Sequence, residues 1–282
     1  MRRADATRLV LLAALWGASF VFMRIVAPVL GPVLAADTRI FVAAAALGLY
    51  FRLIGFDPQW RRWWREYTIV GSMNTALPFV LYAYAAMSIP AGLSVVLNAT
   101  APMWGALLAA PLLRERLTLA RFAGLVLGVA GVALVTHPEP GVDFPPLAIA
   151  AALGGALCYA LAGVYLKRRA QSAPARGMAL GTQLAAGIML TPFLALSPPV
   201  APVTPLVIGC VIAMGLLGGA VAYLLYFRLI IDIGPIRLLT VTYLIPLFGV
   251  LFGAIFLGET LTLWTLFGAA LVILGTALVL RK

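Results

Sequence analysis

The chain contains the same motif twice, and this repeat restricts the folds open to it. Residues 98–131 recur 144 positions later, in apolar sequence, and each repeat holds an odd number of membrane-length segments. An odd number of spans inverts the second repeat relative to the first, an arrangement that recurs in transporters with substrate bound between the repeats. The corresponding positions are Asn98, Pro102, Gly105, Glu115, Leu117, Thr118, Leu119, Gly124 and Gly131 in the first copy, and Thr242, Pro246, Gly249, Glu259, Leu261, Thr262, Leu263, Gly268 and Gly275 in the second.

The composition excludes an ordinary soluble domain. Of the 282 residues, 63% are hydrophobic and only 10% are charged, whereas soluble domains carry roughly 25% charged residues. The net charge of +11 does not indicate nucleic-acid binding, because the basic residues lie in short loops between apolar segments. We therefore expect a small-molecule substrate and the lipid bilayer as partners, no nucleic acid, and a monomer.

Ten segments have the length of a membrane span, which needs about 20 apolar residues. The first follows Met1, Arg2 and Arg3 and resembles a signal peptide, but its apolar run is too long, so we expect it to be retained. The fold class predicted is an all-α polytopic membrane protein with ten transmembrane helices in two inverted five-helix repeats, 1–140 and 141–282. The segments lie near residues 7–26, 33–53, 67–87, 91–112, 119–136, 146–166, 177–196, 205–228, 235–257 and 263–280.

The distribution of basic residues predicts the orientation in the membrane. Of the 20 Lys and Arg residues, 18 lie at the chain ends or in even-numbered loops, so both termini are expected in the cytoplasm. The turn at Glu115 is rich in arginine, whereas its counterpart at Glu259 has no basic residue nearby, as inversion requires. The excess of 18 Arg over 2 Lys is typical of a GC-rich bacterial genome and favours a bacterial inner membrane.

The opening Leu15-Trp16-Gly17-Ala18-Ser19-Phe20 and the doubled Pro-x-x-Gly…Glu-x-Leu-Thr…Gly…Gly pattern resemble a known family. They are similar to the drug/metabolite transporter superfamily, specifically its EamA-type ten-helix exporters, over essentially the whole chain. The resemblance implies two inverted halves around a central cavity, built mainly from spans 1, 3, 4, 6, 8 and 9. It also implies export of amino acids, including aromatic ones, or of related metabolites.

Polar, aromatic and kinked positions inside the spans are the candidates for binding substrate. Polar groups in lipid are costly, so they should face a cavity or a partner helix, and a mid-span proline frees a carbonyl that a cavity can satisfy. Each position has an alternative, since amides and hydroxyls can bond to neighbouring helices or to their own backbone and aromatic rings can pack. The candidates are Trp16, Ser19, Asn74, Pro78, Tyr82, Asn98, Pro102, Trp104, Tyr159, Thr242, Tyr243 and Pro246.

Charged groups are expected only near span ends. Asp37, Glu115, Asp232 and Glu259 all fall there, so carboxylate-based proton coupling is not expected and a gradient-driven facilitator is the simplest mechanism. Arg24 and Arg39 are expected to extend to the membrane interface, although Arg24 remains a candidate contact for anionic substrates. No nucleophile with a base, carboxylate pair or metal-ligand set lies at membrane depth, so we expect no enzyme, catalytic residue, metal or cofactor.

The predicted cavity is apolar, aromatic and nearly uncharged, with a few amides and hydroxyls. This polarity suits a zwitterionic amino acid with an apolar or aromatic side chain, exported by alternating access. The alternative is efflux of hydrophobic drug-like compounds or of another neutral metabolite. The glycine stripe formed by Gly124, Gly128 and Gly131 predicts close packing of two helices rather than a binding site.

Overall fold

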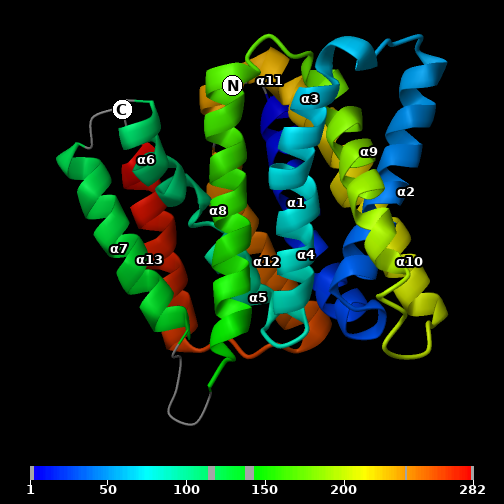
Figure 1. Ribbon diagram of the computed structural model, residues 1–282. Coiled ribbons are helices and arrows are strands. Elements are labelled where there is room, and N and C mark those ends of the chain that lie inside the picture. Colours follow the sequence, from blue (N-terminus) through cyan, green and yellow to red (C-terminus); the bar gives the residue numbers. More distant parts are fainter. Residues whose placement is uncertain (1–2, 114–117, 137–142, 239, 281–282) are drawn as a thin grey trace.

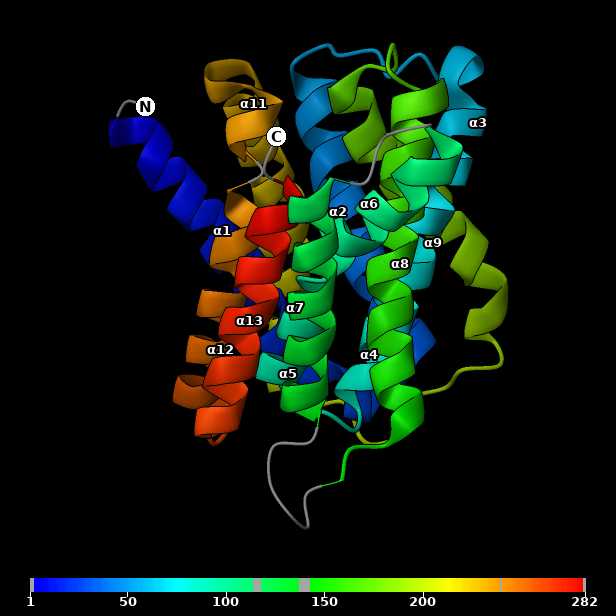
Figure 2. The same cartoon turned by 90° about the vertical axis from the view of Figure 1, so that its left-hand side faces the viewer.

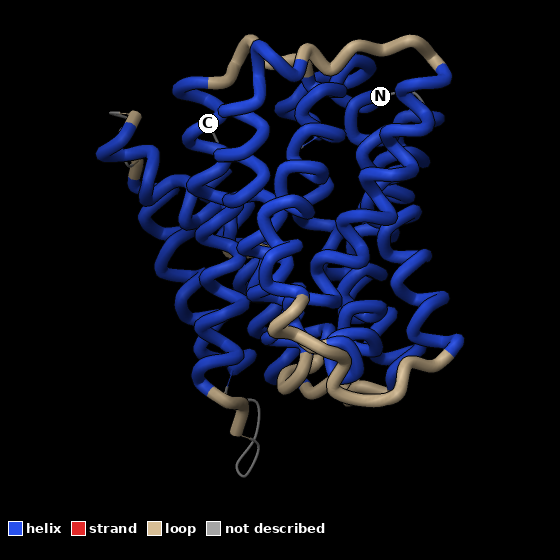
Figure 3. Tube along the Cα trace, turned by 45° about the vertical axis from the view of Figure 1, so that its right-hand side comes forward, coloured by secondary structure: helices blue, strands red, loops and turns tan. Residues whose placement is uncertain are grey.

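The computed structural model describes residues 3–113, 118–136, 143–238 and 240–280, and within these ranges all regular structure is helical (Figures 1 and 3). Short loops join the helices at the two ends of a bundle. In chain order the elements are α1 (Arg3–Leu30), α2 (Pro32–Leu53), α3 (Trp60–Gly71), the π-helical η1 (Ser72–Ala76), α4 (Leu77–Ala86), α5 (Ala91–Asn98), α6 (Ala101–Leu112), α7 (Leu119–Thr136), α8 (Pro146–Arg169), α9 (Ala175–Leu194), α10 (Pro205–Ala213), the π-helical η2 (Met214–Val221), α11 (Ala222–Leu238), α12 (Val241–Leu257) and α13 (Leu263–Leu280).

The described residues contain nine helical stretches long and apolar enough to cross a membrane, and the shorter apolar α12 completes a set of ten spans. The predicted fold class, an all-α polytopic membrane protein with two inverted five-helix repeats, is confirmed. Span 3 is α3, η1 and α4 together, and span 4 is α5 and α6. Span 9 contains α12, and Gly234, inside α11, has a φ of 79° and kinks the chain shortly before it.

Both ends of the chain lie at the same end of the bundle, where α1 begins and α13 ends (Figure 2). We call this end the terminal face and the other end the opposite face. An even number of spans produces this arrangement, because each span carries the chain across the bundle once. The α12–α13 turn and the α4–α5 turn consequently lie at the opposite face.

The last spans of the two repeats, α7 and α13, pack along a seam of glycines (Figure 2). A Cβ added at Gly131 would lie 2.7 Å from the carbonyl oxygen of Gly268, and one at Gly124 would lie 2.5 Å from that of Gly275. Any side chain here would push the two backbones apart. The close packing predicted from the glycine stripe is confirmed.

Spans 3 and 8 each contain a π-helical segment, and the two segments occupy corresponding positions in the repeats. Adding the repeat offset of 144 to η1 (Ser72–Ala76) gives residues 216–220, which lie inside η2 (Met214–Val221). Such segments occur frequently at functional sites because they disturb the regular helical pattern. Here they carry Asn74 and Gly218, which both line the central cavity.

Candidate substrate cavity

A cavity of about 840 Å³ extends from the middle of the bundle to the terminal face. Its deep part is lined from α1, α4, α5 and α8, and its outer part by residues near the ends of helices, including Leu113, Arg121 and Lys167. Sites for small organic molecules usually measure roughly 300–1,000 Å³. The volume therefore suits a metabolite of amino-acid size with accompanying water.

Three aromatic rings form the floor of the cavity. The ring of Tyr82 lies edge-on to Phe20, with centroids 5.5 Å apart, and stacks on Tyr159 with centroids 6.0 Å apart. The Tyr82 hydroxyl donates a hydrogen bond to Oδ1 of Asn98 over 2.9 Å. Because these side chains come from α1, α4, α8 and α5, the floor joins both repeats.

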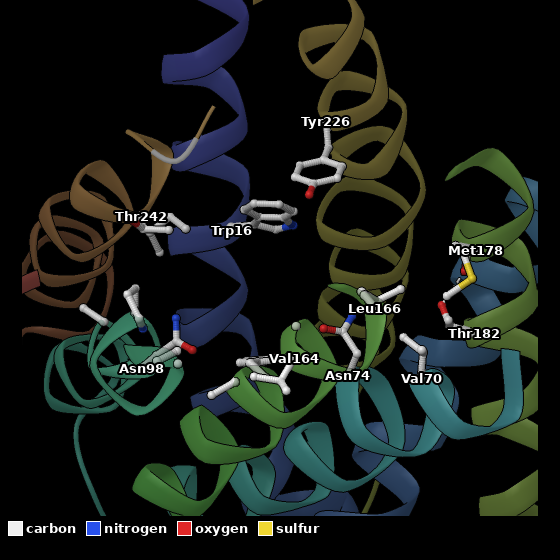
Figure 4. A pocket seen from close by; sticks show the side chains of 18 of the residues that line it. Trp16, Val70, Asn74, Asn98, Val164, Leu166, Met178, Thr182, Tyr226 and Thr242 are labelled. Atoms are coloured by element: carbon white, nitrogen blue, oxygen red, sulfur yellow. Dashed lines mark hydrogen bonds between the residues drawn. The ribbon is translucent and has the colours of Figure 1, made fainter. Parts of the chain in front are cut away.

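Trp16 forms one wall (Figure 4). Its ring lies 5.8 Å from that of Tyr226 and 6.5 Å from that of Tyr223, between centroids. Its indole Nε1 donates to the carbonyl oxygen of Gly218 over 3.2 Å, so the ring is held from α1 against η2. Figure 4 shows Asn98 and Thr242 on one side of Trp16 and Asn74 on the other. Amide, hydroxyl and aromatic groups are thereby directed at the same space.

The structure brings eight of the twelve candidate residues together in the cavity lining: Trp16, Ser19, Asn74, Tyr82, Asn98, Pro102, Tyr159 and Thr242. Pro78, Trp104, Tyr243 and Pro246 do not line it. Each of these four is adjacent in the sequence to a lining residue. Because successive helix positions are rotated by about 100°, such a residue points in a different direction from its lining neighbour. Within the described chain, the buried Nε1 of Trp104 has no hydrogen-bond partner.

Arg39 lines the cavity, whereas the sequence predicted that it would extend to the membrane interface. It is only 8% exposed, it lines the cavity from α2, and its guanidinium carbon lies 3.9 Å from the centroid of the Phe79 ring. Since α2 begins at Pro32, Arg39 is two turns inside the helix and faces inward, so it does not extend to an interface. With Arg121 and Lys167 also in the lining, the expectation of a nearly uncharged cavity is wrong.

Two further charged residues of the spans, Arg24 and Asp37, do not line the cavity. Arg24 donates from Nη1 to the carbonyl oxygen of Ala86, over 2.7 Å, and lies outside the cavity lining. Asp37 is near the start of α2, as expected, but it is only 1% exposed, and its Oδ1 has no hydrogen-bond partner among the described residues. The sequence signal for Arg39 and Asp37 was their position inside an otherwise apolar segment, where a charge is costly.

A contact joins the two repeats at the opposite face. The carboxylate of Glu259, in the α12–α13 turn, accepts hydrogen bonds from the backbone N–H groups of Ala91 (2.6 Å) and Gly92 (2.9 Å). These are the first residues of α5, whose N–H groups have no partner within the helix, and the positive end of the helix dipole favours a carboxylate there. Glu115, the counterpart of Glu259 in the first repeat, lies outside the described residues.

Comparison with known proteins places the chain in a family. Residues 7–137 and 146–281 each match the EamA-like transporter family. An "Uncharacterized transporter" of Archaeoglobus fulgidus is 26% identical, over 97% of this chain and 98% of the relative. A "Probable terminal-alkyne amino-acid exporter" of Streptantibioticus cattleyicolor is 24% identical, over 97% and 92%. A solved crystal structure that is 20% identical covers 99% of this chain and 96% of its own, with a TM-score of 0.68, which supports the fold.

The cavity and the doubled match define the class of protein: this is a multi-pass membrane transporter. The chain belongs to the EamA-like transporter family. This is a family of transporters and not of enzymes. Within the described residues, no group of three His, Cys, Asp or Glu side chains could hold a metal ion.

Proposed function

We propose that the protein exports small metabolites across a bacterial inner membrane, and that amino acids, including aromatic ones, are its substrates. The observation that carries this proposal is the cavity itself, which combines an aromatic floor with amide and hydroxyl groups. Aromatic rings accept an apolar side chain, and groups such as Asn98 and Thr242 can bond the polar end of an amino acid. The name of the Streptantibioticus relative, a probable exporter of an amino acid, adds support.

The proposed mechanism is alternating access between two inverted repeats, 1–140 and 141–282. The terminal face is the cytoplasmic face, because most basic residues lie there. In the conformation described, the cavity then opens to the cytoplasm and Glu259 closes the extracytoplasmic end. Transport is driven by the substrate gradient, since no acidic side chain occurs among the described residues of the lining.

The experiment that tests this proposal is counterflow in proteoliposomes containing the purified protein. Labelled phenylalanine, tryptophan and threonine are offered to vesicles preloaded with the same unlabelled amino acid, without a pH gradient. Saturable uptake of at least one of them is the expected result. Absence of uptake for all three would contradict amino-acid transport. Dependence on an imposed pH gradient would contradict facilitation, and Asp37→Asn would then show whether the buried carboxylate is responsible.

Efflux of hydrophobic drug-like compounds or of another neutral metabolite is the alternative, and the predominance of apolar side chains in the lining favours it. A drug exporter gives broad resistance when it is produced in a susceptible host and shows no saturable amino-acid counterflow. The two functions are distinguished by measuring growth inhibition and counterflow with the same protein.

A further inference from the structure

Arg39 is a cation buried inside the membrane-spanning part of the protein. It is only 8% exposed, and what remains accessible faces the cavity. Removing a charged group from water is costly unless it is paired, and charged side chains in spans therefore mark substrate pathways. The nature of its partner consequently bears on what the cavity binds.

The contacts that Arg39 makes with described residues leave its hydrogen-bonding capacity unused. The guanidinium carbon lies 3.9 Å from the centroid of the Phe79 ring, which is a cation–π contact. The guanidinium also carries five N–H donors in a planar fork. In the part of the chain that the structure describes, the Arg39 side chain makes no ion pair and no hydrogen bond.

Arg39 and Ser19 line the cavity beside the backbone of Gly218. A Cβ at Gly218 would lie 3.8 Å from Nη2 of Arg39 and would clash with Oγ of Ser19, so only glycine lets the two side chains and η2 come this close. Trp16 fixes this part of η2 by donating to the Gly218 carbonyl oxygen. A small polar group of a ligand can therefore reach the guanidinium and the Ser19 hydroxyl together.

The charged side chains in the described part of the cavity lining are all basic. Arg39 is among them and no Asp or Glu is, while Asp37, two residues before Arg39, is buried outside the lining. A low-dielectric cavity focuses the field of such charges, which attracts anions and opposes the entry of cations. Amine drugs and polyamines are therefore disfavoured, whereas a carboxylate is favoured.

We propose that Arg39 binds the carboxylate of the transported solute, so that the cavity selects carboxylic acids with an apolar or aromatic body. The planar fork of donors matches a carboxylate, and the aromatic floor accepts the rest of the molecule. Amino acids and the related 2-oxo acids share this carboxylate, whereas the corresponding amides and amines lack it. This inference rests on the proposed function, because it concerns the same cavity.

Competition in the counterflow assay tests the proposal on the wild-type protein. Phenylpyruvate, phenylalaninamide and phenethylamine are each added against labelled phenylalanine. The amide and the amine are expected to compete at least about tenfold more weakly than unlabelled phenylalanine, because charge-assisted hydrogen bonds are strong. Equal competition by the amide or the amine would overturn the proposal. If phenylpyruvate competes, the substrates include 2-oxo acids as well as amino acids. If it does not compete, the substrates are limited to amino acids, which also carry the carboxylate that Arg39 is proposed to bind.

Variants of Arg39 test whether this residue is responsible. Arg39→Gln is expected to weaken the apparent affinity for phenylalanine by about 10- to 100-fold, with smaller loss in Arg39→Lys, which keeps the charge but not the fork. The matched control is Arg24→Gln, which also removes an arginine from a span, but one that bonds the Ala86 carbonyl outside the cavity lining. It is expected to keep the preference for the acid over the amide.

The failures of the two proposals are distinguishable. Absence of flux for every carboxylate in the wild type contradicts the proposed function. Flux that persists in folded Arg39→Gln with an unchanged preference for acid over amide contradicts the role of Arg39 alone. If Arg39→Gln does not fold, the wild-type competition series decides.

Discussion

The helices α6 and α12 carry the same Pro-x-x-Gly motif in the two repeats, yet they lie in different surroundings. In α6, Pro102 and Gly105 line the cavity, and a Cβ added at Gly105 would meet no atom within 4 Å. In α12, the corresponding Pro246 and Gly249 are buried, and a Cβ at Gly249 would lie 2.5 Å from Cγ1 of Val95 in α5. One copy therefore faces open space and the other is tightly packed.

This difference shows that the position of the cavity is a property of packing and not of the motif. Gly17 of α1 approaches α12 so closely that a Cβ there would lie 2.9 Å from the backbone nitrogen of Gly249. The close contact of α12 with α1 and α5 fills the space that remains open at α6. Under the proposed alternating mechanism the two environments exchange, so that Pro246 and Gly249 line the cavity and Pro102 and Gly105 become packed.

The largest effect is expected from Glu259→Ala, which removes the contact that joins the α12–α13 turn to the start of α5. It leaves the N–H groups of Ala91 and Gly92 without their acceptor. Each unsatisfied buried donor costs about 1–3 kcal/mol, so the free energy of unfolding should fall by about 3 kcal/mol. Thermal unfolding in detergent measures the change. Glu259→Gln retains one acceptor oxygen and should lose about half as much; an Ala variant as stable as wild type would show that the contact does not hold the end closed.

Gly249→Ala should have the next largest effect, because it inserts a methyl group into the contact with Val95. Overpacking of this kind costs about 1–3 kcal/mol. The free energy of unfolding, measured in the same detergent, should fall by that amount. Gly209→Ala in α10 is the control, since a Cβ there meets no atom within 4 Å. Equal stability of the two variants would mean that α12 is not tightly packed.

Tyr82→Phe tests how much the hydrogen bond at the floor of the cavity contributes to stability. It removes the hydroxyl that donates to Asn98 and leaves the stacking with Tyr159 intact. The loss of one such bond should lower the free energy of unfolding by about 1 kcal/mol. Tyr84→Phe, at a residue that is 37% exposed, serves as the control and should change little. The hypothesis that the bond from Tyr82 to Asn98 stabilises the floor fails if both variants unfold at the same temperature.

Gly105→Ala should have the smallest effect on stability, within about 0.5 kcal/mol, because its surroundings are open. Its effect on transport should be larger. If α6 must become packed in the other conformation, the added methyl group opposes that state and slows counterflow. Measurement of both quantities on one preparation separates the two effects. Unchanged counterflow would contradict the exchange of environments between α6 and α12.

Much of this arrangement could be predicted from the sequence because it depends on hydropathy and on the repeat. The spans, the inversion and the glycine contact between α7 and α13 follow from those two signals. Side-chain direction does not, since apolar length gives the depth of a residue but not its rotation about the helix. Arg39 was therefore expected at an interface, and Trp104 was expected in the cavity. The hydrogen bonds from Ala91 and Gly92 at the start of α5 to Glu259 also could not be predicted. The residues that they join are 168 and 167 positions apart in the sequence.

The glycine seam between α7 and α13 has a mechanical consequence. Gly124 and Gly131 are spaced seven residues apart, as are Gly268 and Gly275, so main chain meets main chain at two levels. A slide of one helix along the other would bring a bulky side chain to each level and wedge the pair apart. A small rotation about the line of contact would not. The seam is thus suited to act as a rotation axis. The remaining spans can rotate about it while α7 and α13, the last spans of the two repeats, stay in contact.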